Sequence, residues 1–358
     1  MKWFIRFMVT LLLIAAVSVL GYMYVQYTLS SPPRTKPVEV EVSQGDSIMQ
    51  VGTQLEKKKL IRDDLFFAAY AMVKGQAKAL KPGVYEIPPG TDVNGILDIF
   101  SHAENNVMRL TVPEGYTVDQ IAEELQKKGV DKEAFYRAVN QRTYRHPFLR
   151  HINSSKRKYL LEGYLYPSTY NLSKNTDPEK LVDKMLDQFQ QEMDREQVLQ
   201  KLKAKNMTVD EWVTIASIVE REGQVKDEFP RIAGVIYNRL KTGKKLQVDA
   251  TVQYALGKQK ERLYFKDLKV RSPYNTYLYP GLPPGPISNP GKQALKAALN
   301  PEKHQYFFYV TRKDGSGRHY FARTEADHQR NILRSKQEAR GQTSSQGEPS
   351  SGNGSSSQ

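Results

Sequence analysis

Residues 207–223 read MTVDEWVTIASIVEREG, and this stretch predicts the central helix of the fold. Thr208 and Glu211 form a capping box, in which each side chain bonds the backbone N–H of the other residue. Apolar residues then recur at spacings of four, three and four, the period of one helix face. That stripe ends in a carboxylate and comprises Val209, Val213, Ala216 and Glu220.

Glu220 is the first candidate for chemistry. Loss of solvation at the end of an apolar face raises a carboxyl pKa and can keep the acid protonated near neutral pH. Such a group suits general acid catalysis at a glycosidic oxygen. Glu222 lies about 200° further around the helix, so it points elsewhere and cannot face Glu220 as an acid pair. An ion pair between Glu220 and a neighbouring arginine is the alternative.

A second helix and a third follow this segment. Pro230 can open a helix that stops at Gly243. Asp249 is either a functional carboxylate or the plain N-cap of a helix that ends at Gly257.

Residues 271–291 form a long segment rich in Pro and Gly, which fixes a backbone path instead of a helix or a central strand. Its Tyr, Asn and Ser side chains make it a candidate sugar-binding wall, and a purely structural loop is the alternative. Residues 306–321 predict a hairpin that closes around residues 314–317, Asp-Gly-Ser-Gly.

A short strand, a glycine turn and a helix start recur three times before residue 130. The predicted N-caps are Ser47, Asp92 and Thr117. The copies are unevenly separated, so they indicate a recurring strand–turn–helix motif and not the regular repeats of a solenoid.

The first copy extends to strand, helix, helix and strand within residues 38–105, with Asp63 or Asp64 capping the second helix. This order, opened by Gly45-Asp46-Ser47-Ile48, resembles a LysM module. LysM modules bind glycans that contain N-acetylglucosamine. A small α+β packing domain without affinity for sugar is the alternative.

The first 37 residues predict a membrane anchor. Residues 1–6 carry Lys2 and Arg6 and read as a short cytoplasmic segment, residues 7–27 as a transmembrane helix, and residues 28–37 as a Pro-rich spacer. A cleavable signal peptide is the rival, but its apolar region should be shorter and end in a better cleavage site. The basic start places the N-terminus inside and the bulk of the chain outside.

Composition limits the remaining possibilities. A chain of 358 residues predicts two folded units plus accessories, and 39% hydrophobic residues suffice for a core. The absence of cysteine excludes disulfides, a thiol nucleophile and Cys-ligated metals, and the six histidines form no zincin motif. A net charge of +14 favours polyanionic surroundings. Residues 336–358 are Ser-, Gly- and Gln-rich and predict a disordered tail.

Five short segments, together with the apolar N-terminus and the LysM-like module, resemble the YceG-like endolytic murein transglycosylases. The five segments, in order, are LEGYLYP at 161–167, ASIVERE at 216–222, QVDAT at 247–251, SPYNTY at 272–277 and GLPPGPI at 281–287. The resemblance covers roughly residues 1–334. It implies an α+β fold in which residues 106–335 are the catalytic domain.

The resemblance also implies a reaction. The family cleaves the β-1,4 bond between N-acetylmuramic acid and N-acetylglucosamine inside nascent glycan strands and leaves a 1,6-anhydro end. Glu220 matches the family's catalytic acid, and the nucleophile is the sugar's own 6-hydroxyl, so neither a second carboxylate nor a metal or organic cofactor is expected. Glu222, Tyr274 and Asn275 are secondary candidates for binding substrate.

Glu162 and Asp249 are weaker candidates, and Ala250 stands where proline is expected in many relatives. The implied partners are peptidoglycan glycan strands, the lipid bilayer and peptidoglycan synthases beside which strand elongation ends. A lysozyme-like hydrolase that uses water and a non-catalytic wall-binding scaffold are the alternatives. A nucleic-acid binder is disfavoured, because no recognition motif accompanies the basic residues, which read as a solvated face or a contact with anionic headgroups. The basic residues are Arg142, Arg145, Arg150, Lys156, Arg157 and Lys158.

Overall fold

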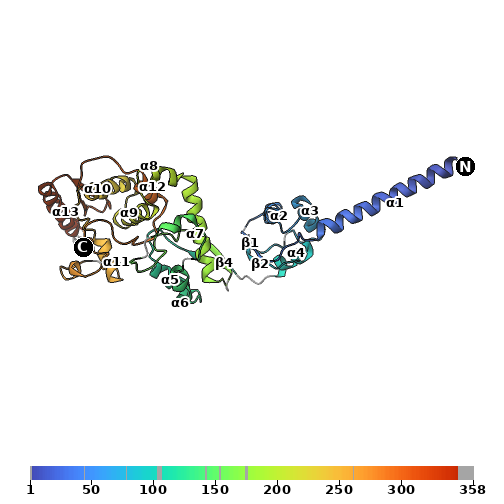
Figure 1. Cartoon of the computed structure of the whole chain (residues 1–358), viewed down its shortest axis with the longest axis horizontal. Coiled ribbons are helices and arrows are strands. Elements are labelled where there is room, and N and C mark those ends of the chain that lie inside the picture. The colour runs from blue at the N-terminus through green and yellow to red at the C-terminus, as the bar shows by residue number, and fades with distance from the viewer. Residues whose placement is uncertain are drawn as a thin grey trace, which may run out of the picture. The chain divides into compact units, whose positions relative to one another are not determined.

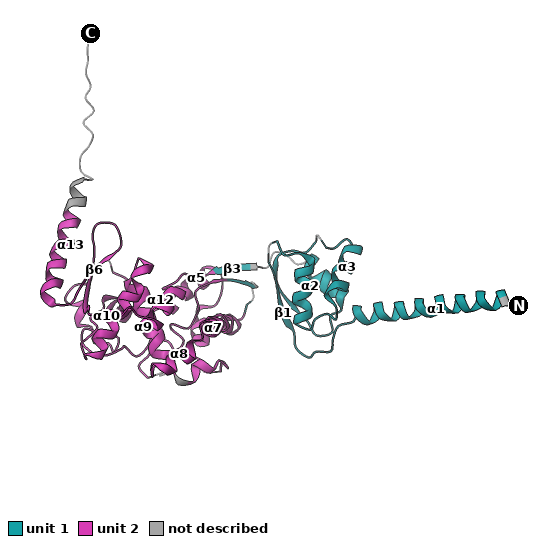
Figure 2. Cartoon of the chain, turned by 90° about the horizontal axis from the view of Figure 1, so that it is seen from above, with its two compact units in different colours: residues 1–110, 170–176 teal, residues 111–169, 177–358 magenta. Residues whose placement is uncertain are grey.

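The computed structural model describes residues 2–345, apart from residues 44, 78, 103–106, 142, 153–154, 174–175 and 261. The described part is a mixed α+β protein, as predicted, and its strands pair into two-stranded sheets. The chain divides into two compact units (Figure 2). Residues 1–110 with 170–176 form the first unit, and residues 111–169 with 177–358 form the second.

The first unit begins with helix α1 (Lys2–Leu29) (Figure 1). Its apolar side chains are exposed along most of its length. The part from Trp3 to Leu29 is long and apolar enough to cross a membrane, by length and composition.

The strand, helix, helix and strand predicted within residues 38–105 are confirmed. Strand β1 lies antiparallel to β2, with Val38 opposite Ile87. The predicted N-caps Ser47 and Asp63 accept backbone N–H groups of α2 and α3. The elements are β1 (Val38–Val42), α2 (Ile48–Lys57), α3 (Asp64–Val73), β2 (Gly83–Ile87) and α4 (Val93–His102).

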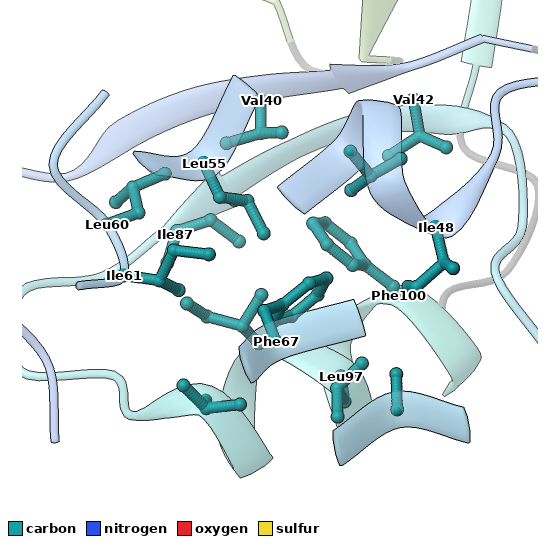
Figure 3. Packing of buried hydrophobic residues seen from close by; sticks show 14 of the residues in the cluster. Val40, Val42, Ile48, Leu55, Leu60, Ile61, Phe67, Ile87, Leu97 and Phe100 are labelled. Atoms are coloured by element: carbon teal, nitrogen blue, oxygen red, sulfur yellow. The ribbon is translucent and has the colours of Figure 1, made fainter. Parts of the chain in front are cut away.

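Apolar side chains from all these elements fill one core. Leu55 of α2, Phe67 of α3 and Phe100 of α4 are fully buried against the inner face of the β1–β2 sheet (Figure 3). The unit also includes Tyr170–Ser173 of strand β4 (Thr169–Ser173) from the middle of the chain. Strand β4 pairs with β3 (Val107–Thr111).

Helix α9 (Val209–Glu222) is the centre of the second unit and is buried from Trp212 to Val219. The predicted capping box of Thr208 and Glu211 starts it. It packs against α12 and α10, and the Trp212 indole N–H donates to the Leu295 carbonyl at 2.9 Å. The other helices are α5 (Val118–Lys127), α6 (Lys132–Val139), α7 (Pro178–Arg195), α8 (Val198–Ala204), α10 (Phe229–Lys241), α11 (Asp249–Leu256), α12 (Lys292–Leu299) and α13 (Glu325–Ser345), with short 3₁₀ turns at Pro147–His151, Lys226–Glu228 and Asp267–Lys269.

The predicted closing hairpin is confirmed as β5 (Phe308–Thr311) paired with β6 (His319–Ala322). Helix α13 follows it and corrects the prediction of disorder from residue 336, because it remains helical to Ser345. The reason is tertiary contact that composition does not reveal. The buried Ser335 hydroxyl donates to the Thr311 carbonyl at 2.8 Å, and Glu338 accepts from the Tyr320 hydroxyl. Residues 346–358 of the predicted tail lie outside the described residues.

Candidate active site

The last turn of α9 places Glu220 and Glu222 in different surroundings, as their helical spacing predicts. Glu222 lines a cavity of about 460 Å³, whereas Glu220 is not among the residues that line it. Helices α10, α11 and α13 and strand β5 supply the other walls. Polar side chains that face the cavity include Arg239, Asp249, Tyr277, Tyr309 and His328.

Glu222 is held at the cavity wall from two sides. Its Oε2 accepts a hydrogen bond from the Tyr309 hydroxyl at 3.0 Å, and the backbone of Ala250 in the first turn of α11 also bonds to it. Burial, the largest cause, and the nearby charge of Asp249 raise the pKa of Glu222 to about 7, although both hydrogen bonds act to lower it. At neutral pH this carboxyl therefore exists in both protonation states, which suits general acid–base catalysis.

Asp249 lies in the same cavity and accepts the Tyr277 hydroxyl at 2.6 Å. The alternative of a plain N-cap is wrong, because Val248 is the N-cap of α11 and Asp249 is its first helical residue. The structure thus brings two of the predicted site residues, Glu222 and Asp249, into one cavity.

Glu220 is half-buried. Its Oε2 accepts the backbone N–H of Gly291 at 2.9 Å, and its side chain packs close to Gly115. Burial is the main cause that raises the pKa of Glu220, as predicted from its place on the apolar stripe, and the Gly291 bond opposes that rise. Among the described residues, Glu220 forms no ion pair with arginine.

Glu162 lies in a buried network away from this cavity and is 1% exposed. It accepts the Val118 N–H at the start of α5 and the Tyr254 hydroxyl, both at 3.1 Å. Asn289 donates to it at 3.2 Å and also accepts the Gly163 N–H at 3.0 Å. Asn289 therefore ties its own loop to the family-like segment of residues 161–167, so this network holds the backbone in place.

Tyr274 and Asn275 are also buried parts of the framework. Asn275 is fully buried, and its amide donates to the Leu268 and Val270 carbonyls at 2.9 Å each. Tyr274 packs its ring on Tyr254, with centroids 4.8 Å apart. The loop of residues 271–291 contributes Tyr277, and not these two residues, to the cavity.

Arg157 is buried, whereas the sequence predicted that it belongs to a solvated basic face. Its side chain is 2% exposed, pairs with Asp210 and donates to the Pro284 carbonyl at 3.1 Å. Arg142 of the same cluster lies outside the described residues.

The cavity also contains residues that the sequence did not single out. Tyr309 and Tyr277 belong to segments that the sequence did quote, but no local pattern indicates that their hydroxyls meet Glu222 and Asp249. Arg239 and His328 come from ordinary-looking helices. In the part of the chain that the structure describes, no three histidine, aspartate or glutamate side chains cluster as metal ligands.

Comparison with known proteins gives a consistent picture. A model of the YceG-like family matches residues 40–334. The endolytic murein transglycosylase of Streptococcus pneumoniae strain R6 is 34% identical over 358 residues, which is 92% of this chain, and the chain spans 64% of that relative's length. The endolytic murein transglycosylase of Bacillus subtilis strain 168 is 34% identical over 78% of this chain and 79% of the relative. A crystal structure of a YceG-like protein from Listeria monocytogenes is similar with a TM-score of 0.55 and 33% identity, over 82% of this chain and 98% of that one.

Proposed function

Because the chain belongs to the YceG-like family, we propose that it is an endolytic murein transglycosylase. It cleaves the β-1,4 bond between N-acetylmuramic acid and N-acetylglucosamine inside a glycan strand and leaves a 1,6-anhydro end. Glu222 is its general acid, a role for which the sequence favoured Glu220. The similarity to two proteins named for this activity supports the reaction, and the cavity supports the choice of residue.

The observation that carries the choice is the position of Glu222 in a cavity, with a pKa raised to about 7. A glycosidic oxygen must reach the acid, and a cavity of about 460 Å³ lies in the range of ligand-binding pockets. In Glu220, by contrast, one carboxylate oxygen accepts a hydrogen bond from the backbone N–H of Gly291.

The reaction needs one carboxyl group that works twice. Protonated Glu222 gives its proton to the glycosidic oxygen, the bond to the anomeric carbon breaks, and positive charge develops on the sugar ring. The resulting carboxylate takes the proton of the 6-hydroxyl as that oxygen bonds to the anomeric carbon. Glu222 is thereby protonated again, and no water is consumed. Asp249, whose charge acts on the same cavity, stabilises the cationic ring.

The rest of the chain brings the enzyme to nascent wall. Helix α1 anchors it in the membrane with the N-terminus inside and the second unit outside. The LysM-like module of β1, α2, α3 and β2 holds a glycan strand. The enzyme acts beside peptidoglycan synthases and ends strand elongation.

Digestion of purified peptidoglycan by the full-length protein, followed by mass spectrometry, tests the reaction. Anhydro-ended fragments from wild type and none from Glu222→Gln are expected. Products heavier by one water would contradict the transglycosylase and indicate a lysozyme-like hydrolase, in which Asp249 activates water. Intact strands would indicate the non-catalytic scaffold.

A further inference from the structure

Helix α13 contributes a wall to the cavity that contains Glu222. Its residues Glu325, His328, Gln329 and Ile332 line the cavity. The helix is fixed there by Ser335, which donates to Thr311 at the end of β5. Strand β5 in turn carries Tyr309, the hydrogen-bond donor to Glu222. The wall is therefore rigidly connected to the proposed acid.

His328 is the α13 residue best placed for recognition. Its ring stacks on Phe308 of β5, with centroids 5.1 Å apart and planes inclined by 20°, so its orientation is fixed. Its Nδ1 is enclosed and has no hydrogen-bond partner among the described residues. The side chain lines the cavity. Because Nδ1 is enclosed, Nε2 is the ring nitrogen left to bind a ligand there.

The state of the ring follows from these contacts. Burial is the main cause that lowers the pKa of His328, the charge of Arg239 also lowers it, and Glu325 opposes both, so the imidazole is neutral at neutral pH. An enclosed N–H without an acceptor is rarer than an enclosed lone pair, so the proton belongs on Nε2. Nε2–H is then the hydrogen-bond donor that the ring can offer to a ligand in the cavity.

We propose that α13 is the substrate-binding wall of the active site and that His328 donates a hydrogen bond from Nε2 to an oxygen of the bound sugar. This inference rests on the proposed function, because it takes a glycan as the occupant of the cavity. A fixed donor in such a wall lowers KM without touching the reacting bond.

The test compares full-length variants on uncrosslinked glycan strands. His328→Ala is expected to raise KM about tenfold and to change kcat less than about twofold, the signature of lost binding. His328→Gln, whose amide nitrogen can replace Nε2, is expected to restore KM to within roughly threefold of wild type. Leu333→Ala, on the exposed side of the same helix, is the control for helix stability. An unchanged KM in His328→Ala, or an equal effect in Leu333→Ala, overturns the inference.

A second readout separates this inference from the reaction itself. Binding of the same strands to Glu222→Gln is measured by calorimetry with and without His328→Ala, and the double variant is expected to bind about tenfold more weakly. Binding that is indifferent to His328 overturns the inference alone. Absence of any glycan binding overturns the proposed function together with it.

Discussion

Two carboxyl groups two residues apart on α9 lie in different surroundings within the second unit. Glu220 faces the backbone of Gly291 and packs close to Gly115, where it joins segments of the framework. Glu222 faces a cavity and a tyrosine hydroxyl from a hairpin that begins 86 residues later. Burial raises the pKa of both carboxyls, and that of Glu222 is raised to about 7.

A raised pKa by itself therefore does not distinguish the two carboxyls as candidate acids. Desolvation acts on any carboxyl at the end of a buried helix face. Catalysis also needs space for the substrate next to the proton, and that space depends on which other elements surround the helix. Single substitutions around each carboxyl test this difference.

Glu222→Gln should have the largest effect. It keeps the side-chain volume but removes the proton, so kcat for strand cleavage is expected to fall about 10²–10⁴-fold. Strand binding should change less than about threefold, because the amide still fills the same place. Single-turnover kinetics and calorimetry measure the two quantities, and a pure loss of binding would count against an acid.

Asp249→Asn should alter the pH dependence. In wild type, activity is expected to fall as pH rises through the Glu222 pKa of about 7, because the protonated acid disappears. The charge of Asp249 helps to raise that pKa, so its removal lowers the pKa and moves the alkaline limb of the kcat profile to lower pH. A shift of about one pH unit reduces the rate above neutral pH about tenfold. An alkaline limb at the same pH as in wild type would mean that Asp249 does not affect the pKa of Glu222.

Tyr309→Phe should shift the same limb in the opposite direction. The Tyr309 hydroxyl stabilises the ionised form of Glu222, so its loss raises the pKa and extends activity to higher pH. The change in rate at neutral pH is expected to stay within about threefold, since the acid remains. Shifts of the same sign in Tyr309→Phe and Asp249→Asn would refute this description of the cavity.

Glu220→Ala should have a local structural effect. It removes the acceptor of the Gly291 N–H, so exchange of that amide hydrogen is expected to accelerate about tenfold in the region around α12. Hydrogen exchange read by NMR measures this directly. An amide that exchanges as slowly as in wild type would mean that Glu220 does not anchor this loop.

Local chemistry explains which predictions succeeded. The helix starts at Ser47, Thr117 and Thr208 were predictable because a capping box involves residues three apart. The apolar stripe that ends at Glu220 was also predictable, because it depends only on residues three and four apart on one helix. The same stripe predicted that burial raises the pKa of Glu220.

Features that depend on distant segments were not predictable. The cavity beside Glu222 exists because β5 and α13 pack there. The polar composition of residues 336–345 gave no indication that α13 continues as a helix to Ser345. Tyr274 and Asn275 resembled site residues by their motif, yet both are buried in the framework. Asn289 was overlooked, although its side chain bonds to both Glu162 and Gly163, because a single amide carries no sequence signal.

A side-by-side measurement of kcat for Glu220→Gln and Glu222→Gln on one preparation of peptidoglycan tests the central claim most directly. Glu220→Gln is expected to retain at least about a tenth of wild-type activity, because its amide oxygen can still accept the Gly291 N–H. Glu222→Gln is expected to lose about 10²–10⁴-fold. The reverse order, with Glu220→Gln inactive and Glu222→Gln active, would contradict the assignment of Glu222 as the acid.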